Sequence, residues 1–193
     1  MNIEKSRMIE TKRKSITIIP KEIKENEKIL DIGGGGEGII SRIYKRNVTA
    51  IDKRKDELDE ISETESLKIV MDATAMTFID NQFDRATAFF SFMYMKEDEI
   101  IKSIMEVHRV LKKNGSFEIW DIEMPSVHQV KEEIFIAQIE VISEDLIINT
   151  GYGVQLKEEQ SLDTFVELLK NNGFTSVISK SSIDNVFYIE MKK

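Results

Sequence analysis

Cysteine is absent from the 193-residue sequence, and this absence excludes disulfides, thiolate nucleophiles and cysteine metal sites. No apolar run approaches the roughly 18 residues that a membrane-spanning helix needs, and no signal-peptide pattern precedes the first predicted strand. We therefore expect no membrane partner and no export. A cytoplasmic location is the default expectation.

Proline is scarce, and both prolines, Pro20 and Pro125, stand at boundaries between predicted elements. The sequence has no linker rich in glycine, serine or proline and no internal repeat. With 41% apolar residues the chain can bury one sizeable core, but it is short for two catalytic domains. We therefore predict a single domain over residues 1–193.

Positive charge is in deficit, because 27 lysines and arginines face 35 aspartates and glutamates and give a net charge of −8. Such a surface repels nucleic-acid backbones and anionic lipids. Nucleic acid is therefore not expected as a partner, whereas a homodimer remains open.

Apolar runs and amphipathic segments alternate along the first two thirds of the chain. Residues 37–45 and 97–112 carry apolar side chains at spacings of three and four, which is typical of helices packed on a core. Strands alternating with helices indicate an α/β fold, a Rossmann-like, doubly wound and mainly parallel sheet. The runs that suit its buried strands are Lys28–Ile32, Asn47–Ile51, Lys68–Met71, Arg85–Ser91 and Ser116–Trp120.

The C-terminal third breaks this alternation. Residues 133–156 read as two strands joined by a polar turn, which predicts a β-hairpin inserted after the fifth strand. A further amphipathic helix begins near Leu162. The last two runs, 174–180 and 186–192, are separated by a short turn, so we expect a C-terminal antiparallel strand pair.

The most specific segment is a strand that runs through Asp31 into four consecutive glycines and then into a helix. Glycines allow the backbone to turn tightly and to approach a ligand closely. Asp52 ends the next strand, near the spacing at which an acid binds ribose hydroxyls. Because Gly33, Gly35 and Gly38 spell G-x-G-x-x-G, this segment alone suits a dinucleotide equally well.

Further motifs follow in order at Val70–Ala73, Phe83–Ala86 and Arg109–Gly115. Together with the glycine segment they resemble the class I S-adenosylmethionine-dependent methyltransferases, especially small members acting on small molecules. The resemblance covers residues 27–115 and the terminal strand pair. It implies S-adenosylmethionine as cofactor, S-adenosylhomocysteine as product, and a glycine loop beside the methionyl group. It also implies an acid on the ribose and an acid and an amide at the adenine. The implied cofactor residues are Asp31, Gly33, Gly34, Gly35, Asp52, Lys53, Asp72, Ala73 and Phe89.

Two departures from the family pattern stand out. Glu37 occupies the place of the third loop glycine. The fourth strand ends in Phe89-Phe90-Ser91-Phe92, not in the Asn/Asp-Pro-Pro-aromatic motif of family members that methylate adenine or glutamine nitrogens. An adenine or glutamine acceptor is therefore not expected.

The acceptor pocket is expected between the ends of the fourth and fifth strands and the hairpin. No catalytic base is assigned, because His108 lies on the apolar face of a helix and His128 in a surface loop. No metal-ligand spacing occurs. The candidate acceptor residues are Phe92, Tyr94, Trp120, Asp121, Glu123 and Tyr152.

The sequence leaves alternatives open. An NAD-dependent oxidoreductase shares the glycine pattern, although no Tyr-x-x-x-Lys pair or substrate domain supports hydride chemistry. A non-catalytic cofactor-binding module and a macromolecular acceptor are the others. Residues 1–24 are interpreted as a helical segment, and the family resemblance suggests that it forms a lid over the cofactor.

Overall fold

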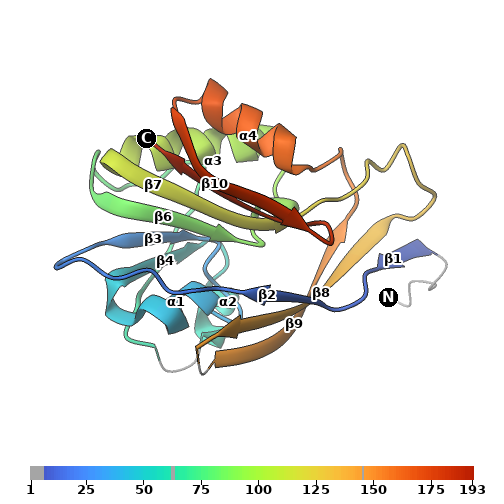
Figure 1. Ribbon diagram of the computed structural model, residues 1–193, viewed down its shortest axis with the longest axis horizontal. Coiled ribbons are helices and arrows are strands. Elements are labelled where there is room, and N and C mark those ends of the chain that lie inside the picture. Colours follow the sequence, from blue (N-terminus) through green and yellow to red (C-terminus); the bar gives the residue numbers. More distant parts are fainter. Residues whose placement is uncertain (1–6, 62–63, 145) are drawn as a thin grey trace.

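A central seven-stranded sheet forms the framework of the protein (Figure 1). The computed structural model describes residues 7–61, 64–144 and 146–193. The strand order is β10-β11-β7-β6-β3-β4-β5, and the five strands from β7 to β5 run parallel. β11 lies antiparallel between β7 and β10. The strands are β3 (Ile29–Ile32), β4 (Val48–Asp52), β5 (Leu67–Val70), β6 (Phe83–Phe89), β7 (Leu111–Ile122), β10 (Ser176–Ile183) and β11 (Val186–Lys192).

Helices cover both faces of this sheet, as the doubly wound prediction requires. α3 (Glu97–Val110) and α4 (Leu162–Asn171) lie on one face, where Ile104 and Leu169 are fully buried. α1 (Ile39–Tyr44) and α2 (Lys55–Glu60) lie on the other. Short 3-10 turns occupy Lys45–Asn47 and Phe92–Tyr94. Every residue of β3 is buried, as expected for a central parallel strand.

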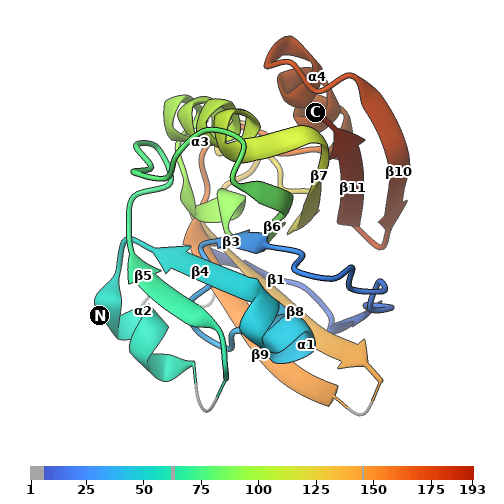
Figure 2. The same cartoon turned by 90° about the vertical axis from the view of Figure 1, so that its left-hand side faces the viewer.

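A second, smaller sheet packs against the α1 face. It contains β1 (Met8–Glu10), β2 (Lys14–Thr17), β8 (Ile134–Ser143) and β9 (Leu146–Gln155). β8 and β9 pair antiparallel, which places a hairpin within the range expected for it, and Figure 2 shows this hairpin crossing below β3 and β4. Alternate β8 residues, including Phe135 and Ile139, are buried in the same core cluster as Trp120.

The N-terminal segment is not helical, so that prediction is wrong for residues 7–24. β1 and β2 instead pair in parallel with β8. The physical reason is a period-2 pattern, because Ile16 and Ile18 are buried while Thr17 between them is exposed. β8 would otherwise present an unpaired edge, which these strands cover. Residues 1–6 of the predicted segment lie outside the described residues.

One predicted boundary also moves. A helix was expected over residues 97–112, up to the Asn114-Gly115 pair, but α3 ends at Val110 and β7 begins at Leu111. Asn114 has φ +65°, and the pairing of β7 with β6 shifts register across this point. The Asn-Gly pair is therefore an irregularity inside a strand and not a helix end.

The packing of the hairpin on the main sheet can be tested by truncating one buried side chain. Ile139→Ala should lower the free energy of unfolding by about 2–4 kcal/mol, because Ile139 is fully buried and its loss leaves a cavity. Ile147→Ala on β9 is the control, since Ile147 is 64% exposed and should cost below about 0.5 kcal/mol. Equal losses in denaturant titrations would show that β8 does not pack as described.

Candidate functional site

A cavity of about 530 Å³ opens at the carboxyl ends of β3, β4, β5 and β6. This is the edge of a parallel sheet at which α/β proteins bind ligands. All nine residues predicted to bind the cofactor line this cavity. Their individual roles remain predictions, but one surface now joins segments that are far apart in the sequence.

The glycine loop leaves no room for side chains. A Cβ atom on Gly33 would lie 2.6 Å from the Cβ of Ser91, and Gly33 has φ +62°. A Cβ atom on Gly34 would lie 2.5 Å from Oδ2 of Asp31. Both contacts are too short for any side chain, so the backbone itself forms the floor of the cavity.

Asp31 is the buried acid of the site. Its side chain accepts a hydrogen bond from Oγ1 of Thr87 at 2.7 Å, and the residue is 1% exposed. Burial raises the pKa of Asp31 to about 7, and the charge of Asp52 acts in the same direction, while the Thr87 bond opposes both. A cation bound beside Asp31 would favour its ionised form.

Two further acids stand at the ends of β4 and β5. Oδ1 of Asp52 accepts a hydrogen bond from the Arg54 amide at 2.8 Å. Oδ1 of Asp72 accepts hydrogen bonds from the amide and the hydroxyl of Thr74, at 2.8 and 2.7 Å. These bonds lower the pKa of Asp72 and keep it ionised at neutral pH. The backbone bonds fix both carboxylates at the cavity.

An aromatic wall closes the side of the cavity nearest the hairpin. Tyr152 from β9 stacks on Phe90 with ring centroids 4.9 Å apart, and its edge meets Phe89 at 6.5 Å. Phe90 has φ +50°, a strained conformation for a bulky residue. Tyr94 also lines the cavity, and burial, with the charges of Asp121 and Glu37, raises the pKa of its hydroxyl to about 12. Its hydroxyl therefore stays protonated at neutral pH.

Sequence reasoning missed several residues of this cavity, and two of them, Glu37 and Ser91, carry polar groups that matter for the site. Glu37 accepts hydrogen bonds from the hydroxyls of Thr150 and Tyr152, so its carboxylate joins the glycine loop to β9. The sequence showed that Glu37 occupies the place of a loop glycine, but it did not show that Thr150 and Tyr152 donate hydrogen bonds to it. Ser91 is buried, and its hydroxyl has no hydrogen-bond partner within the described residues, so it is available to a ligand.

Four predicted acceptor residues do not line this cavity, and that placement is corrected. Phe92 is buried between Phe117 and Phe165, with ring centroids 6.1 and 5.5 Å away. Glu123 accepts a hydrogen bond from the Ser182 hydroxyl, at the turn between β10 and β11. Trp120 packs on Tyr188 with ring centroids 4.8 Å apart and lies 6.1 Å from the ring of Phe89, so it stands behind that cavity residue and does not line the cavity itself.

Asp121 is the fourth, and it is fully buried. Its carboxylate accepts hydrogen bonds from the amides of Met93 and Ile122 and from Gln160. Burial raises its pKa to about 7, as it does for Asp31, but Asp121 faces protein groups alone. The physical reason is that β7 continues to Ile122, so Trp120 and Asp121 point to opposite faces of a strand and not beyond its end.

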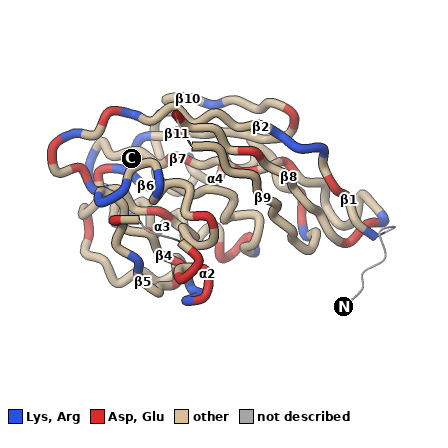
Figure 3. The backbone as a smooth tube through the Cα atoms, turned by 90° about the horizontal axis from the view of Figure 1, so that it is seen from below, with Lys and Arg blue, Asp and Glu red and all other residues tan. Residues whose placement is uncertain are grey.

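The cavity carries an excess of negative charge. Two basic residues, Lys53 and Arg54, line it, and Figure 3 shows acidic residues gathered along the neighbouring helix α2. This balance favours a ligand with positive charge. The six acids are Asp31, Glu37, Asp52, Glu57, Asp72 and Glu99.

Within the described residues there is no group of three or more side chains that could hold a metal ion. No helix in the same part of the chain is long and apolar enough to span a bilayer.

The raised pKa of Asp31 has a consequence for stability. Its folded-state pKa of about 7 exceeds the ordinary 3.8, so folding favours the protonated form and the ionised form destabilises the fold as the pH rises through about 7. Asp31→Asn removes this charge and should be more stable than the wild type at about pH 8, on the order of 1–3 kcal/mol. The gain should shrink as the pH falls toward 4.

Asp84→Asn is a control for which we expect a change in stability of the opposite sign. Burial raises the pKa of Asp84, but hydrogen bonds from Lys112 and the Lys28 amide outweigh it and lower the pKa overall. That variant should be less stable than the wild type at neutral pH. Denaturant titrations across this pH range check both, and a wild type as stable as Asp31→Asn at about pH 8 would contradict the burial argument.

Comparison with known proteins gives the family of this region. Residues 30–119 match a family described as a methyltransferase domain. A curated relative, 2-methyl-6-phytyl-1,4-hydroquinone methyltransferase 2 of rice (Oryza sativa subsp. japonica), is 32% identical over 96 residues. The match covers 46% of this chain and 27% of the relative, so the chain spans about a quarter of that protein's length.

Solved structures share the fold. A protein of Pyrococcus horikoshii OT3 matches with a TM-score of 0.64 and 17% identity, over 87% of this chain and 83% of that chain. A SAM-dependent methyltransferase of Methanosarcina mazei matches with a TM-score of 0.60 and 20% identity, over 89% of this chain and 94% of that chain. Residues 30–119 are thus similar to a methyltransferase domain family, and the chain shares its fold with a SAM-dependent methyltransferase of known structure.

Proposed function

We propose that the protein transfers the methyl group of S-adenosylmethionine to a small-molecule acceptor. The observation that carries this proposal is the cavity in which acids from the ends of three neighbouring strands, Asp31, Asp52 and Asp72, meet a glycine loop that leaves no space for side chains. This arrangement supplies backbone and carboxylate contacts along an extended ligand.

Each part of the cofactor has a candidate partner. The glycine loop and Asp31 are assigned to the methionyl group, whose ammonium suits a buried carboxylate. Asp52, with Lys53 beside it, is assigned to the ribose, and Asp72 with the Ala73 amide to the adenine. The surplus of acids suits a sulfonium cofactor and disfavours the pyrophosphate of a dinucleotide, which argues against the oxidoreductase alternative.

The acceptor end of the cavity favours a small molecule. Phe90, Tyr94 and Tyr152 enclose it, and the hairpin stands over it. The cavity volume of about 530 Å³ leaves little room beside a nucleoside cofactor. The rice relative is named for a phytyl-substituted hydroquinone, a single organic molecule and not a polymer, and the negative charge of this chain disfavours nucleic acid.

Catalysis then depends on alignment in a dry site. When bound, S-adenosylmethionine supplies an electrophilic methyl group on a positively charged sulfur. Phe89, Phe90 and Tyr152 exclude water from the side wall, and their ring faces suit a positive charge. Holding a nucleophile in line with the methyl carbon is worth about 7–11 kcal/mol. Glu37 lines the cavity as a carboxylate that can accept a proton from the acceptor.

Cofactor binding is tested with Asp52→Asn. This variant should weaken S-adenosylhomocysteine binding about tenfold or more in isothermal titration calorimetry, because a charged hydrogen bond to the ribose is lost. Asp59→Asn, at an exposed position on α2, is the matched control and should bind as the wild type does. Binding of NAD by the wild type, with none of S-adenosylhomocysteine, would overturn the assignment.

Acceptor size is tested by transfer from a tritiated methyl donor in a cell extract. The wild type should label material that passes a dialysis membrane, and Asp52→Asn should label it less. Label retained with protein or nucleic acid would contradict a small acceptor. If the protein binds the donor and yet labels neither fraction, the non-catalytic module is favoured.

A further inference from the structure

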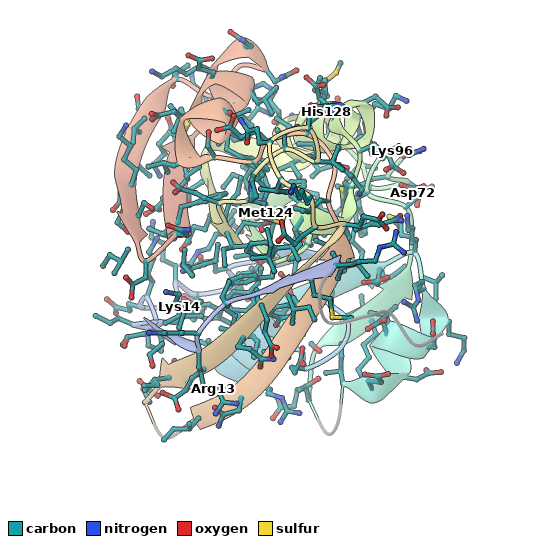
Figure 4. The ribbon with its side chains drawn as sticks, turned by 90° about the vertical axis from the view of Figure 1, so that its right-hand side faces the viewer. Arg13, Lys14, Asp72, Lys96, Met124 and His128 are labelled. Carbon is teal, nitrogen blue, oxygen red and sulfur yellow. The ribbon has the colours of Figure 1, made fainter. Side chains whose placement is uncertain are left out.

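A second cavity, of about 330 Å³, lies between the N-terminal strand β2 and the main sheet. Its walls come from β2 and residues 18–21 on one side and from β7, β11 and the end of β10 on the other. It shares no lining residue with the cofactor cavity. In Figure 4, Lys14 at the second cavity lies on the opposite side of the molecule from Asp72 at the first.

Four aromatic residues, Tyr44, Trp120, Phe187 and Tyr188, line this cavity, and three of their rings concern the ligand. Trp120 and Tyr188 pack together with ring centroids 4.8 Å apart. Tyr44 is the third, and the guanidinium of Arg85 lies 5.0 Å from its ring centroid. Aromatic faces attract cations, by about 0.5–2 kcal/mol each. Apolar side chains such as Ile16 and Ile18 complete a lining typical of small-molecule sites.

Buried carboxylates stand behind the rings. Glu118 is 2% exposed, and the hydroxyl of Tyr188 lies 3.0 Å from Oε2 of Glu118 and 3.2 Å from Oε2 of Glu190, so its single proton is donated to one of the two carboxylates. The ammonium of Lys21 lies 3.0 Å from Oε1 of Glu118 and 2.7 Å from Oε2 of Glu190. An amine of the protein itself therefore already occupies the space between these two carboxylates.

The charges of this cluster do not balance. Three carboxylates, those of Glu27, Glu118 and Glu190, face two cations, Lys21 and Arg85. Oε1 of Glu118 lies 3.0 Å from the Lys21 ammonium and 3.4 Å from Nε of Arg85, but within the described residues neither contact has the geometry of a well-formed hydrogen bond. A surplus buried charge with an unfilled acceptor is costly, and a further cation would offset it.

We propose that this cavity binds a small organic amine with an apolar body. The ammonium of the ligand lies at Glu118 against the faces of Trp120 and Tyr188, and the body contacts Ile16 and Ile18. Lys21 is the internal competitor for the same carboxylates. Anions are disfavoured because Lys21 is held by two carboxylates and Lys14 lies 3.8 Å from Asp184. The site is independent of methyl transfer.

Trp120 is the only tryptophan of the chain and lines this cavity, so its fluorescence reports on occupancy. The test titrates the full-length protein with benzylamine, benzyl alcohol and benzoate, which share a ring and differ in charge. Benzylamine should change the fluorescence saturably, benzyl alcohol should bind about tenfold more weakly or worse, and benzoate should not bind. Equal responses to the three, or no saturable response to benzylamine, would overturn the proposal.

Two variants sharpen the test because they act in opposite directions. Glu118→Gln removes the surplus charge and should weaken benzylamine about tenfold, whereas Lys21→Met removes the competitor and should tighten it. Glu123→Gln, outside the cavity on the same segment, should leave benzylamine binding unchanged. A purely structural defect does not raise affinity, so weaker binding by Lys21→Met, with its fold verified by circular dichroism, would contradict the assigned role.

The test of the amine site can fail or succeed independently of the test of cofactor binding. Calorimetry with S-adenosylhomocysteine should give the same affinity with and without benzylamine, because the two cavities share no residue. Competition between the two ligands would show that benzylamine binds in the cofactor cavity, and it would contradict the proposed second site.

Discussion

The close approach of the Gly33 backbone to the side chain of Ser91 shapes the floor of the cofactor cavity. It brings the loops after β3 and β6 so close that a single methyl group on Gly33 would overlap Ser91. β3 and β6 are hydrogen-bonded neighbours, and Phe90, the residue before Ser91, has the strained φ of +50° just after β6 ends. The floor of the cavity and the Phe90 part of its aromatic wall are thus both formed by the loops that follow β3 and β6.

Much of the fold follows from local pattern. The parallel strands are short, buried apolar runs, and α3 and α4 have one apolar face each, so burial dictates their type without knowledge of their neighbours. β1 and β2 differ, because their strand form depends on β8, which no local window contains. Pairing with β8 therefore decided the structure of residues 7–24, for which the sequence had predicted a helix.

The residues at the sheet edge of the cavity were predictable in place, whereas only Tyr94 and Tyr152 of the expected acceptor residues line it. Glycines and strand-end acids are tied to the sheet edge by topology, so Asp52 and Asp72 reach the cavity. The acceptor side depends on where β7 stops and on which hairpin residues face inward. Tyr152 faces the cavity by its register on β9, whereas Trp120 lies inside β7, two residues before its end.

Asp31 and Asp121 show why burial alone does not define a site. Both carboxyl groups are almost inaccessible to solvent and burial raises the pKa of both to about 7. Asp121 is surrounded by donors that the protein supplies. Asp31 has one hydroxyl partner and borders open space, so it retains capacity for a ligand.

The pairing of β2 with β8 sets an order of events during synthesis. Ser15 on β2 and its partner Glu140 on β8 are 125 residues apart in the chain. A ribosome makes about 5–20 residues each second, so β2 waits several seconds before its partner exists. During that interval β1 and β2 lack their partner strand, so the second sheet forms only after β8 has been made.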